Sequence, residues 1–165
     1  MVDTWIGPLL AALALPRYGL STVFVVAFVS ATLLPMGSEP AVFGYVKLNP
    51  DAFWVTVLVA TLANTLGGLT NYALGRAAKA AVAPQDGTRY LAWFQRFGAK
   101  TLLLSWLPVV GDPLCAVAGW LRLPVWSCVA WMALGKLLRY TTMTSALLWI
   151  PDDWWRRLIA MFTGA

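Results

Sequence analysis

Two acidic residues stand inside apolar stretches of this chain, and they are its strongest candidates for chemistry. Glu39 is the only glutamate, and Asp112 is the only aspartate within an apolar stretch. At the depth of a bilayer a charged side chain costs about 2.5–3.5 kcal/mol, so it persists only where it is paired, protonated or facing water. The two acids therefore predict proton-binding or substrate-gating groups. The alternative is helix capping, by Ser38 or Glu39 at the start of the second arm of the first break and by Asp112 before Pro113.

The candidate partners of these acids are cations and amides in neighbouring apolar stretches. Lys136 and Arg139 are the available cations, and Arg76 lies near the end of another stretch. Asn64 and Asn71 lie seven residues apart, which places them on one face of a helix. They either line a substrate or proton pathway with the charged residues, or form hydrogen bonds between helices.

The composition indicates an integral membrane protein. Of the 165 residues 60% are hydrophobic and 12% charged, and ten are tryptophan, a residue that favours the membrane interface. The net charge of +5 is scattered, which argues against nucleic-acid binding. There is no histidine, and Cys115 and Cys128 lack metal-ligand spacing. We expect no enzyme activity, no cofactor and no metal site.

Four apolar stretches organise the chain. Residues 52–75 and 125–150 are each long enough to cross a bilayer as one helix. The other two stretches are each interrupted by two prolines five residues apart, with glycine and an acid between them, a pattern that no α-helix continues through. The residues of these breaks are Pro35, Gly37, Pro40, Pro108, Gly111 and Pro113.

The broken stretches have two interpretations. The flanking arms of the second break, residues 99–107 and 115–122, would each reach about 12–14 Å, roughly half of the hydrocarbon core. Such arms predict re-entrant hairpins that enter and leave the membrane on the same side. The alternative is two spanning helices with proline kinks.

Two echoes indicate an internal repeat. Both breaks read Leu-Pro, three residues, acid, Pro, and Gly67 followed by Asn71-Tyr72 recurs as Gly135 followed by Arg139-Tyr140. A re-entrant hairpin makes no net crossing and a spanning helix makes one, so the second unit would start from the opposite face. We therefore predict an all-α membrane fold of two inverted repeats, each a re-entrant hairpin plus a transmembrane helix, whose site lies where the repeats meet.

We expect one membrane domain over residues 1–165. The positive-inside rule places the positively charged linker between the two units in the cytoplasm and both termini outside. The expected segments are an N-terminal interfacial helix (1–19), hairpin one (20–50), a transmembrane helix (51–76), an amphipathic linker (77–98), hairpin two (99–122), a transmembrane helix (123–150) and an interfacial tail (151–165).

These motifs together resemble the DedA family of bacterial membrane proteins, which carry a VTT-type domain, and in particular its YqaA-like branch. The similarity extends from about residue 20 to 140. The matching motifs are SATLLP at 30–35 with SE at 38–39, AN at 63–64, GGLTN at 67–71, LGR at 74–76, LLLSW at 102–106, PVVGD at 108–112, AGW at 118–120, LGK at 134–136 and LRY at 138–140.

The resemblance implies a multi-pass protein of the inner membrane that moves phospholipid or the phosphate-bearing carrier lipid, with proton coupling. It makes Glu39 the counterpart of the family's essential hairpin acid. One departure concerns the arginines that the broader family carries around its second hairpin proline. Here Ser105 and Gly111 occupy those positions. Since arginines are natural phosphate ligands, Lys136 and Arg139 would have to replace them.

We therefore expect a lipid transporter of the flippase or scramblase type that supports membrane homeostasis, with Glu39 and Asp112 at facing hairpin tips. The alternative is a membrane scaffold or lipid-packing modulator that transports nothing. The sequence leaves open the transported lipid, the orientation of the termini and whether identical chains associate.

Overall fold

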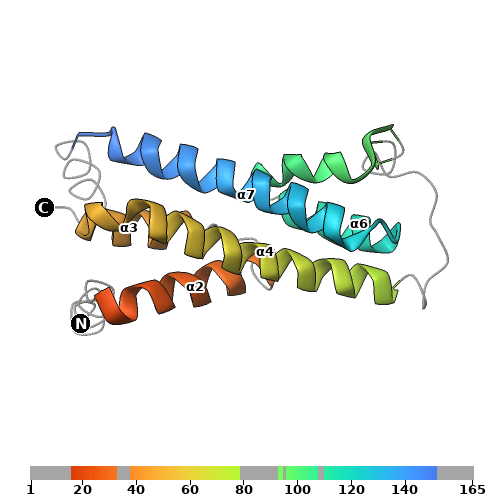
Figure 1. Ribbon diagram of the computed structural model, residues 1–165, viewed down its shortest axis with the longest axis horizontal. Helices are drawn as coiled ribbons and strands as arrows, with labels where there is room; N and C mark the ends of the chain where they lie inside the picture. The colour runs from red at the N-terminus through yellow and green to blue at the C-terminus, as the bar shows by residue number, and fades with distance from the viewer. Residues whose placement is uncertain (1–15, 33–37, 79–92, 95, 108–109, 152–165) are drawn as a thin grey trace, which may run out of the picture.

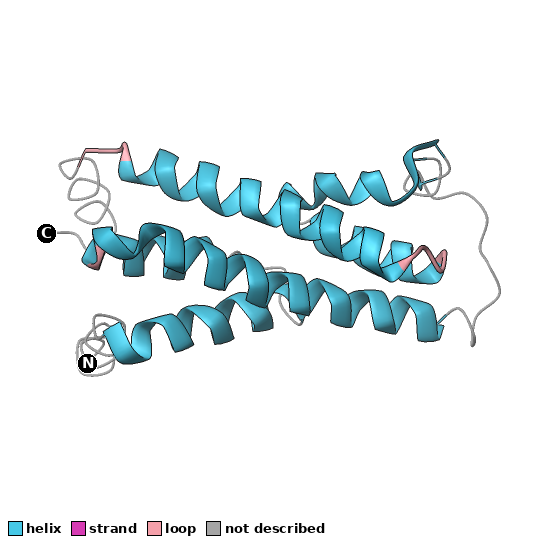
Figure 2. Ribbon diagram, viewed as in Figure 1, coloured by secondary structure: helices cyan, strands magenta, loops and turns pink. Residues whose placement is uncertain are grey.

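The computed structural model describes residues 16–32, 38–78, 93–94, 96–107 and 110–151, and this part of the chain is helical without any strand. An all-α fold was expected from the sequence. The helices are α2 (Pro16–Thr32), α3 (Glu39–Leu48), η1 (Pro50–Ala52), α4 (Phe53–Ala78), η2 (Gly98–Trp106), α6 (Gly111–Trp120) and α7 (Val125–Leu148) (Figures 1 and 2).

Two long helices, α4 and α7, form the frame. With 26 and 24 residues they reach about 39 and 36 Å. The sequence predicted long helices over 52–75 and 125–150, and both are confirmed as helices. Among the described residues one helix, Pro50–Ala78, has both the length and the mean hydropathy (1.6) of a membrane span. Length and composition alone do not separate such a helix from the core helix of a soluble protein.

Shorter helices flank the two breaks. Pro40 lies in the first turn of α3 and Pro113 in the first turn of α6, where the missing N–H of proline leaves no hydrogen bond unmade. The segment before the second break, η2, is a 3-10 helix. Pro35, Gly37 and Pro108 lie outside the described residues.

The short helices pair along opposite halves of the long ones (Figure 1). In the first helix pair, α2 and α3, the end of α2 meets the middle of α4, and α3 starts beside the middle of α7. In the second helix pair, η2 and α6, the end of η2 lies against Gly135 of α7, and Cys115 in α6 lies beside Gly68 of α4. Each pair therefore occupies one half of the bundle.

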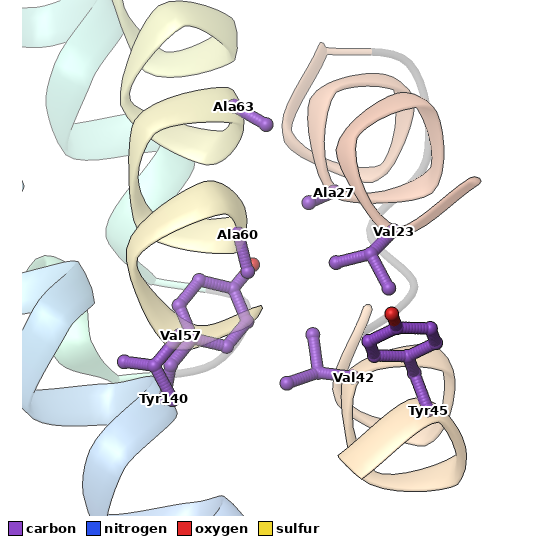
Figure 3. Packing of buried hydrophobic residues seen from close by; sticks show 8 residues of the cluster. All are labelled: Val23, Ala27, Val42, Tyr45, Val57, Ala60, Ala63 and Tyr140. Carbon is purple, nitrogen blue, oxygen red and sulfur yellow. The ribbon is translucent and has the colours of Figure 1, made fainter. Parts of the chain in front are cut away.

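Each half has its own apolar core. The first core joins α2, α3, the first half of α4 and the second half of α7, as Figure 3 shows for Val23, Val42, Val57 and Tyr140. The second core joins η2, α6, the second half of α4 and the first half of α7. Its members include Tyr72, Leu102, Leu114 and Met132. The long helices run antiparallel and connect the two cores.

Glycines let the short helices approach the long ones closely. A methyl group at Gly67 in α4 would meet the Cβ atom of Ala31 in α2 at 2.5 Å, and one at Gly135 in α7 would meet the carbonyl oxygen of Leu103 in η2 at 2.6 Å. Gly67 and Gly135 are the equivalent positions of the sequence echo. At this repeat position, α4 is thus in close contact with α2, and α7 is in close contact with η2.

Two helix bounds add detail to the expected segments. α2 begins at Pro16, so the last residues of the expected interfacial segment 1–19 belong to this helix. The interfacial character expected for residues 1–15, for most of the linker 77–98 and for 152–165 concerns residues outside the described part. η1, before α4, was not predicted.

The contact between α4 and α6 generates a stability prediction. A methyl group at Gly119 would overlap the backbone carbonyl of Tyr72, and backbone atoms have no alternative rotamer. We expect Gly119→Ala to lower the free energy of unfolding by about 1–3 kcal/mol. Chemical denaturation in mixed detergent micelles would measure this change. Gly44→Ala is the control, because no atom lies within 4 Å of the added methyl group; equal stability of the two variants would contradict the close approach.

Candidate functional site

Four charged side chains meet at one turn of α7. Lys136 and Arg139 are three residues apart and therefore project from neighbouring positions of the same helix face. Arg139 pairs with Glu39, the first residue of α3, and Lys136 pairs with Asp112, the second residue of α6. We call these four residues the charge cluster. The fold thus brings together both acids and both cations that the sequence singled out.

The Glu39–Arg139 pair is the more buried one. Nε and Nη2 of Arg139 both donate hydrogen bonds to the same oxygen, Oε1 of Glu39, the first at 2.5 Å. The side chains are 14% exposed for Glu39 and 7% for Arg139. Next to this pair the hydroxyls of Ser38 and Tyr140 share a buried hydrogen bond of 2.5 Å. Together these contacts fix the start of α3 on the middle of α7.

The Lys136–Asp112 pair has a different composition. Lys136 is 1% exposed, and its Nζ atom donates to Oδ1 of Asp112 at 3.2 Å. The same ammonium donates to the backbone oxygen of Asn64 at 2.8 Å and to the Oδ1 atom of Asn64. Asp112 is 27% exposed. Three oxygens from two helices therefore surround this ammonium.

Both asparagines of α4 bind the first helix pair. Asn64 donates from Nδ2 to the carbonyl oxygen of Ala27 at 2.9 Å, and Asn71 donates to that of Ala31 at 2.7 Å. Hydrogen bonding between helices, one of the two sequence interpretations, is confirmed for both residues. Asn64 additionally belongs to the charge cluster, because its side-chain oxygen is left free to accept from Lys136.

The capping alternative for the two acids is wrong in this structure. Ser38 and Val110 are the N-cap residues of α3 and α6, and neither helix has a side-chain cap hydrogen bond. Glu39 and Asp112 lie inside the first turn and direct their carboxylates to α7 instead. The first turn still suits an acid, because the N-terminal end of the helix dipole is positive.

Space for the ammonium comes from a glycine. Gly68 of α4 faces Lys136, and an added methyl group there would meet Lys136 Nζ, Cys115 Sγ and Met132 Sδ, each at 3.3 Å. The repeat-equivalent position in α7 is Lys136 itself, 68 residues later. At this repeat position the second unit has the cation Lys136, and the first unit has Gly68, which leaves space for the ammonium group. The two halves are therefore not chemically equivalent.

Two sequence expectations concern residues outside the cluster. Arg76 lies exposed in the last turn of α4, and none of the contacts of the cluster involves it. At the two positions where the sequence resemblance implied arginines, Ser105 is buried, and a methyl group on Gly111 would meet the Ser105 carbonyl oxygen at 2.7 Å. The backbone therefore leaves no room for a longer side chain at Gly111.

Sequence reasoning did not assign a role to two tyrosines of the site region. Tyr140 bonds Ser38 of the other unit, and Tyr72 donates to the carbonyl oxygen of Leu123, also in the other unit, at 2.6 Å. The two tyrosines occupy equivalent positions of the repeat, so the recurring Gly-to-Tyr pattern in the sequence could have indicated their role. Within the described residues no three metal-ligating side chains gather, and Cys115 and Cys128 are buried free thiols.

Comparison with known proteins gives a family. The VTT domain matches this chain over residues 40–147. The inner membrane protein YqaA of Escherichia coli K12 is 43% identical over 127 residues, covering 77% of this chain and 89% of that protein, and YqaA of Shigella flexneri gives the same values. An uncharacterized protein of Haemophilus influenzae is 40% identical over 134 residues, covering 73% and 82%. No solved structure matches the chain significantly.

The buried pairing of Glu39 and Arg139 can be tested by stability. Arg139→Met leaves a carboxylate buried without its cation, and we expect a loss of about 3–5 kcal/mol in the free energy of unfolding. The double variant Glu39→Met, Arg139→Met removes both charges and should recover most of that loss. Arg76→Met is the matched control on an exposed cation, with a change within about 0.5 kcal/mol. Strictly additive losses in the double variant would refute the pairing.

Proposed function

Because this chain belongs to the VTT domain family, the DedA family, we propose that it is a multi-pass transporter of the bacterial inner membrane that moves lipid across the bilayer. The location is supported by the 43% identity to inner membrane proteins named YqaA. The proposal goes further than the family in naming the substrate class and the site.

Exposed apolar side chains support a membrane setting for both long helices. Leu58, Leu62 and Leu66 follow one another at four-residue spacing on the outer side of α4, and Leu134 and Leu138 do so on α7. These residues are more than a third exposed in the described part of the chain. A soluble core helix would bury such a stripe, whereas lipid tails solvate it.

Tryptophans support the same depth for α7. Trp126 at its start is 85% exposed, and Trp149 just after its end is 90% exposed. The separation of 23 residue steps from Trp126 to Trp149 corresponds to about 35 Å of helix, slightly more than the roughly 30 Å hydrocarbon core. Indole rings favour the two membrane–water interfaces. We therefore take α7, like α4, as a membrane-crossing helix despite its charges.

In this setting the two helix pairs are re-entrant hairpins of inverted repeats. α2 packs on α4 of its own unit and α3 reaches α7 of the other unit. In the second unit η2 packs on α7, its own long helix, and α6 reaches α4. The same exchange of partners in both units is the arrangement expected for a two-fold relation in the membrane plane.

The observation that carries the proposal is the charge cluster. Its four side chains lie halfway along two helices of membrane length, between the two apolar cores. Charged groups at that depth are costly and are typical of transport pathways, and repeat interfaces are where transporters place their sites.

The chemistry of the cluster suits a lipid with an anionic headgroup. Lys136 and Arg139 are the phosphate-binding groups that the helices offer at mid-depth, but each is engaged by a carboxylate. A headgroup phosphate therefore gains a cation when a carboxylate is neutralised by a proton. This competition couples lipid binding to protonation.

A second candidate function is a membrane scaffold or lipid-packing modulator. The specific observation in its favour is that all four charges of the cluster are paired, as in a purely structural lock. This function requires no movement of lipid from one leaflet to the other. A transport assay therefore separates the two candidates.

Lipid movement gives the functional prediction. In liposomes that contain headgroup-labelled phospholipid and an external quencher, the protein should make the inner-leaflet label accessible. The variant Glu39→Gln, Asp112→Asn should slow this exchange to the rate of protein-free liposomes. Asp51→Asn is the matched control, since Asp51 is an exposed acid in η1. Wild-type protein that behaves like empty liposomes would leave the scaffold function in place of transport.

The re-entrant topology gives a separate prediction. Single cysteines at Ser21 and Lys47, near the outer ends of α2 and α3, should react with an impermeant thiol reagent from one side of the membrane. Cysteines at Arg76 and Arg122, at the other end of the bundle, should react from the opposite side. The background carries alanine at Cys115 and Cys128, both buried. Labelling of Ser21 and Lys47 positions from opposite sides would disprove the first hairpin.

A further inference from the structure

The two ion pairs of the charge cluster differ in what happens when the acid is neutralised. We propose that Asp112, and not Glu39, is the carboxylate that gains and loses the proton, and that Asn64 is the positioning residue that permits this by holding the Lys136 ammonium. The inference rests on the proposed function, because proton binding at this site has a role only if the protein is a proton-coupled transporter. Its test reads protonation directly and does not require transport.

The first step concerns the acceptors around Lys136. An ammonium group has three N–H donors, and the three acceptors here are Asp112 Oδ1, the backbone oxygen of Asn64 and Asn64 Oδ1. The Asp112 contact, at 3.2 Å, is longer than both contacts to Asn64. When Asp112 is protonated, two of the three acceptors stay in place. The buried cation therefore remains solvated by the protein.

The orientation of Asn64 is fixed for this task. Its amide nitrogen donates to the Ala27 carbonyl oxygen in α2, so its amide oxygen must face the other way, toward Lys136. A flipped amide would present N–H donors to an ammonium and lose both contacts. The asparagine therefore holds the ammonium from α4 whatever the charge on Asp112.

Among the described residues, the Glu39–Arg139 pair has no additional acceptor of this kind. Both hydrogen bonds that Arg139 donates within the described residues end on Glu39 Oε1. Protonation of Glu39 would leave a guanidinium that is 7% exposed without its counter-charge. Arginine cannot release its own proton to escape this cost, and an unpaired buried charge is strongly unfavourable. We assign Glu39 and Arg139 to a permanent clamp between α3 and α7.

Solvent accessibility also favours Asp112 over Glu39 as the protonated group. The Asp112 side chain is 27% exposed, about twice the 14% of Glu39. The elements packed on α6 present few other titratable groups to Asp112. α7 contributes Lys136, with Arg139 and Tyr140 one turn further, α6 itself contributes Cys115, and α4 and η2 contribute the neutral side chains of Asn64 and Ser105.

The proton step is simple to balance. A hydronium ion transfers its proton to a carboxylate oxygen of Asp112, which forms one O–H bond and leaves a water molecule, while Lys136 keeps its own protons. The charge of the pair changes from zero to plus one. That surplus positive charge, held by Asn64, is what an anionic headgroup would then meet. Loss of the proton restores the ion pair and expels the headgroup.

Infrared difference spectroscopy of the reconstituted protein tests this assignment. Acidification should produce the carbonyl band of a buried protonated carboxyl group. We expect this band in the wild type and in Glu39→Gln, and we expect it to be absent in Asp112→Asn. Asp51→Asn, on an exposed acid of η1, should leave the band unchanged. A band that persists in Asp112→Asn and disappears in Glu39→Gln would overturn the proposal, as would the absence of any such band.

The wild-type protein supplies a version of the test that needs no variant. Glu39 is the only glutamate, so ¹³C-carboxyl glutamate labels one side chain. The band should keep its frequency with labelled glutamate and shift with labelled aspartate. A shift with labelled glutamate would assign the proton to Glu39 and overturn the proposal even if a variant failed to fold.

The role of Asn64 has its own matched pair of variants. Asn64→Leu and Asn71→Leu each remove one hydrogen bond from a side-chain amide to a carbonyl oxygen of α2, at 2.9 and 2.7 Å. Of these two asparagines, only Asn64 also contacts Lys136. Asn64→Leu removes the side-chain acceptor Oδ1 but keeps the backbone oxygen of this position, so the ammonium depends more on the Asp112 carboxylate and the proton should bind only at lower pH. We expect the midpoint of the band to move about one to two pH units downward in Asn64→Leu and to stay unchanged in Asn71→Leu. Equal midpoints would remove Asn64 from the mechanism.

The outcome separates this inference from the proposed function. Lipid exchange with the band assigned to Glu39 would keep transport and reject Asp112 as the proton carrier. A band assigned to Asp112 in a protein that exchanges no lipid would keep the protonation site and reject transport.

Discussion

Pairing of buried charge is the constraint on which the rest of this structure depends. Lys136 and Arg139 project from the middle of α7 and are buried, and an unpaired buried charge is strongly unfavourable. The two counter-charges come from the first turns of α3 and α6. Both short helices must therefore begin halfway along α7. The breaks in the apolar stretches lie where this pairing requires a helix to start.

Close backbone contact makes the pairing geometrically feasible. Short helices that end in the middle of a bundle reach their partners only if side chains do not hold them away. Gly67 admits α2, Gly135 admits η2, and Gly119 brings α6 against α4. Gly68 has a different role, because it gives the Lys136 ammonium its space. The glycines and the charges thus depend on each other. α4 provides the space at Gly68 and the neutral acceptors of Asn64, and α7 provides the two cations.

The sequence predicted much of this fold because its signals are local. Long apolar runs predicted α4 and α7, and the proline-and-acid pattern predicted new helix starts, which agree with the starts of α3 and α6. The charged members of the site were also predicted, since an acid in an apolar stretch is conspicuous. Which acid meets which cation was not predicted, because it depends on the rotation of α7 against its neighbours. The capping interpretation failed for the same reason: the local pattern fits a cap, but Glu39 and Asp112 gain more from tertiary partners. The 3-10 geometry of η2 and the Ser38–Tyr140 bond likewise arise only from packing.

The central claim is that the broken stretches deliver their acids to the charged turn of α7, and a distance across one ion pair tests it most directly. Glu39 is the only glutamate, so protein labelled with ¹³C-carboxyl glutamate and ¹⁵N-arginine reports one carboxylate against the guanidinium groups in solid-state NMR of lipid bilayers. The account predicts a strong dipolar coupling, corresponding to an ion-pair distance within about 4 Å, that vanishes in Arg139→Met. A glutamate carboxylate without coupling to any guanidinium, or a coupling that survives in Arg139→Met, would contradict it.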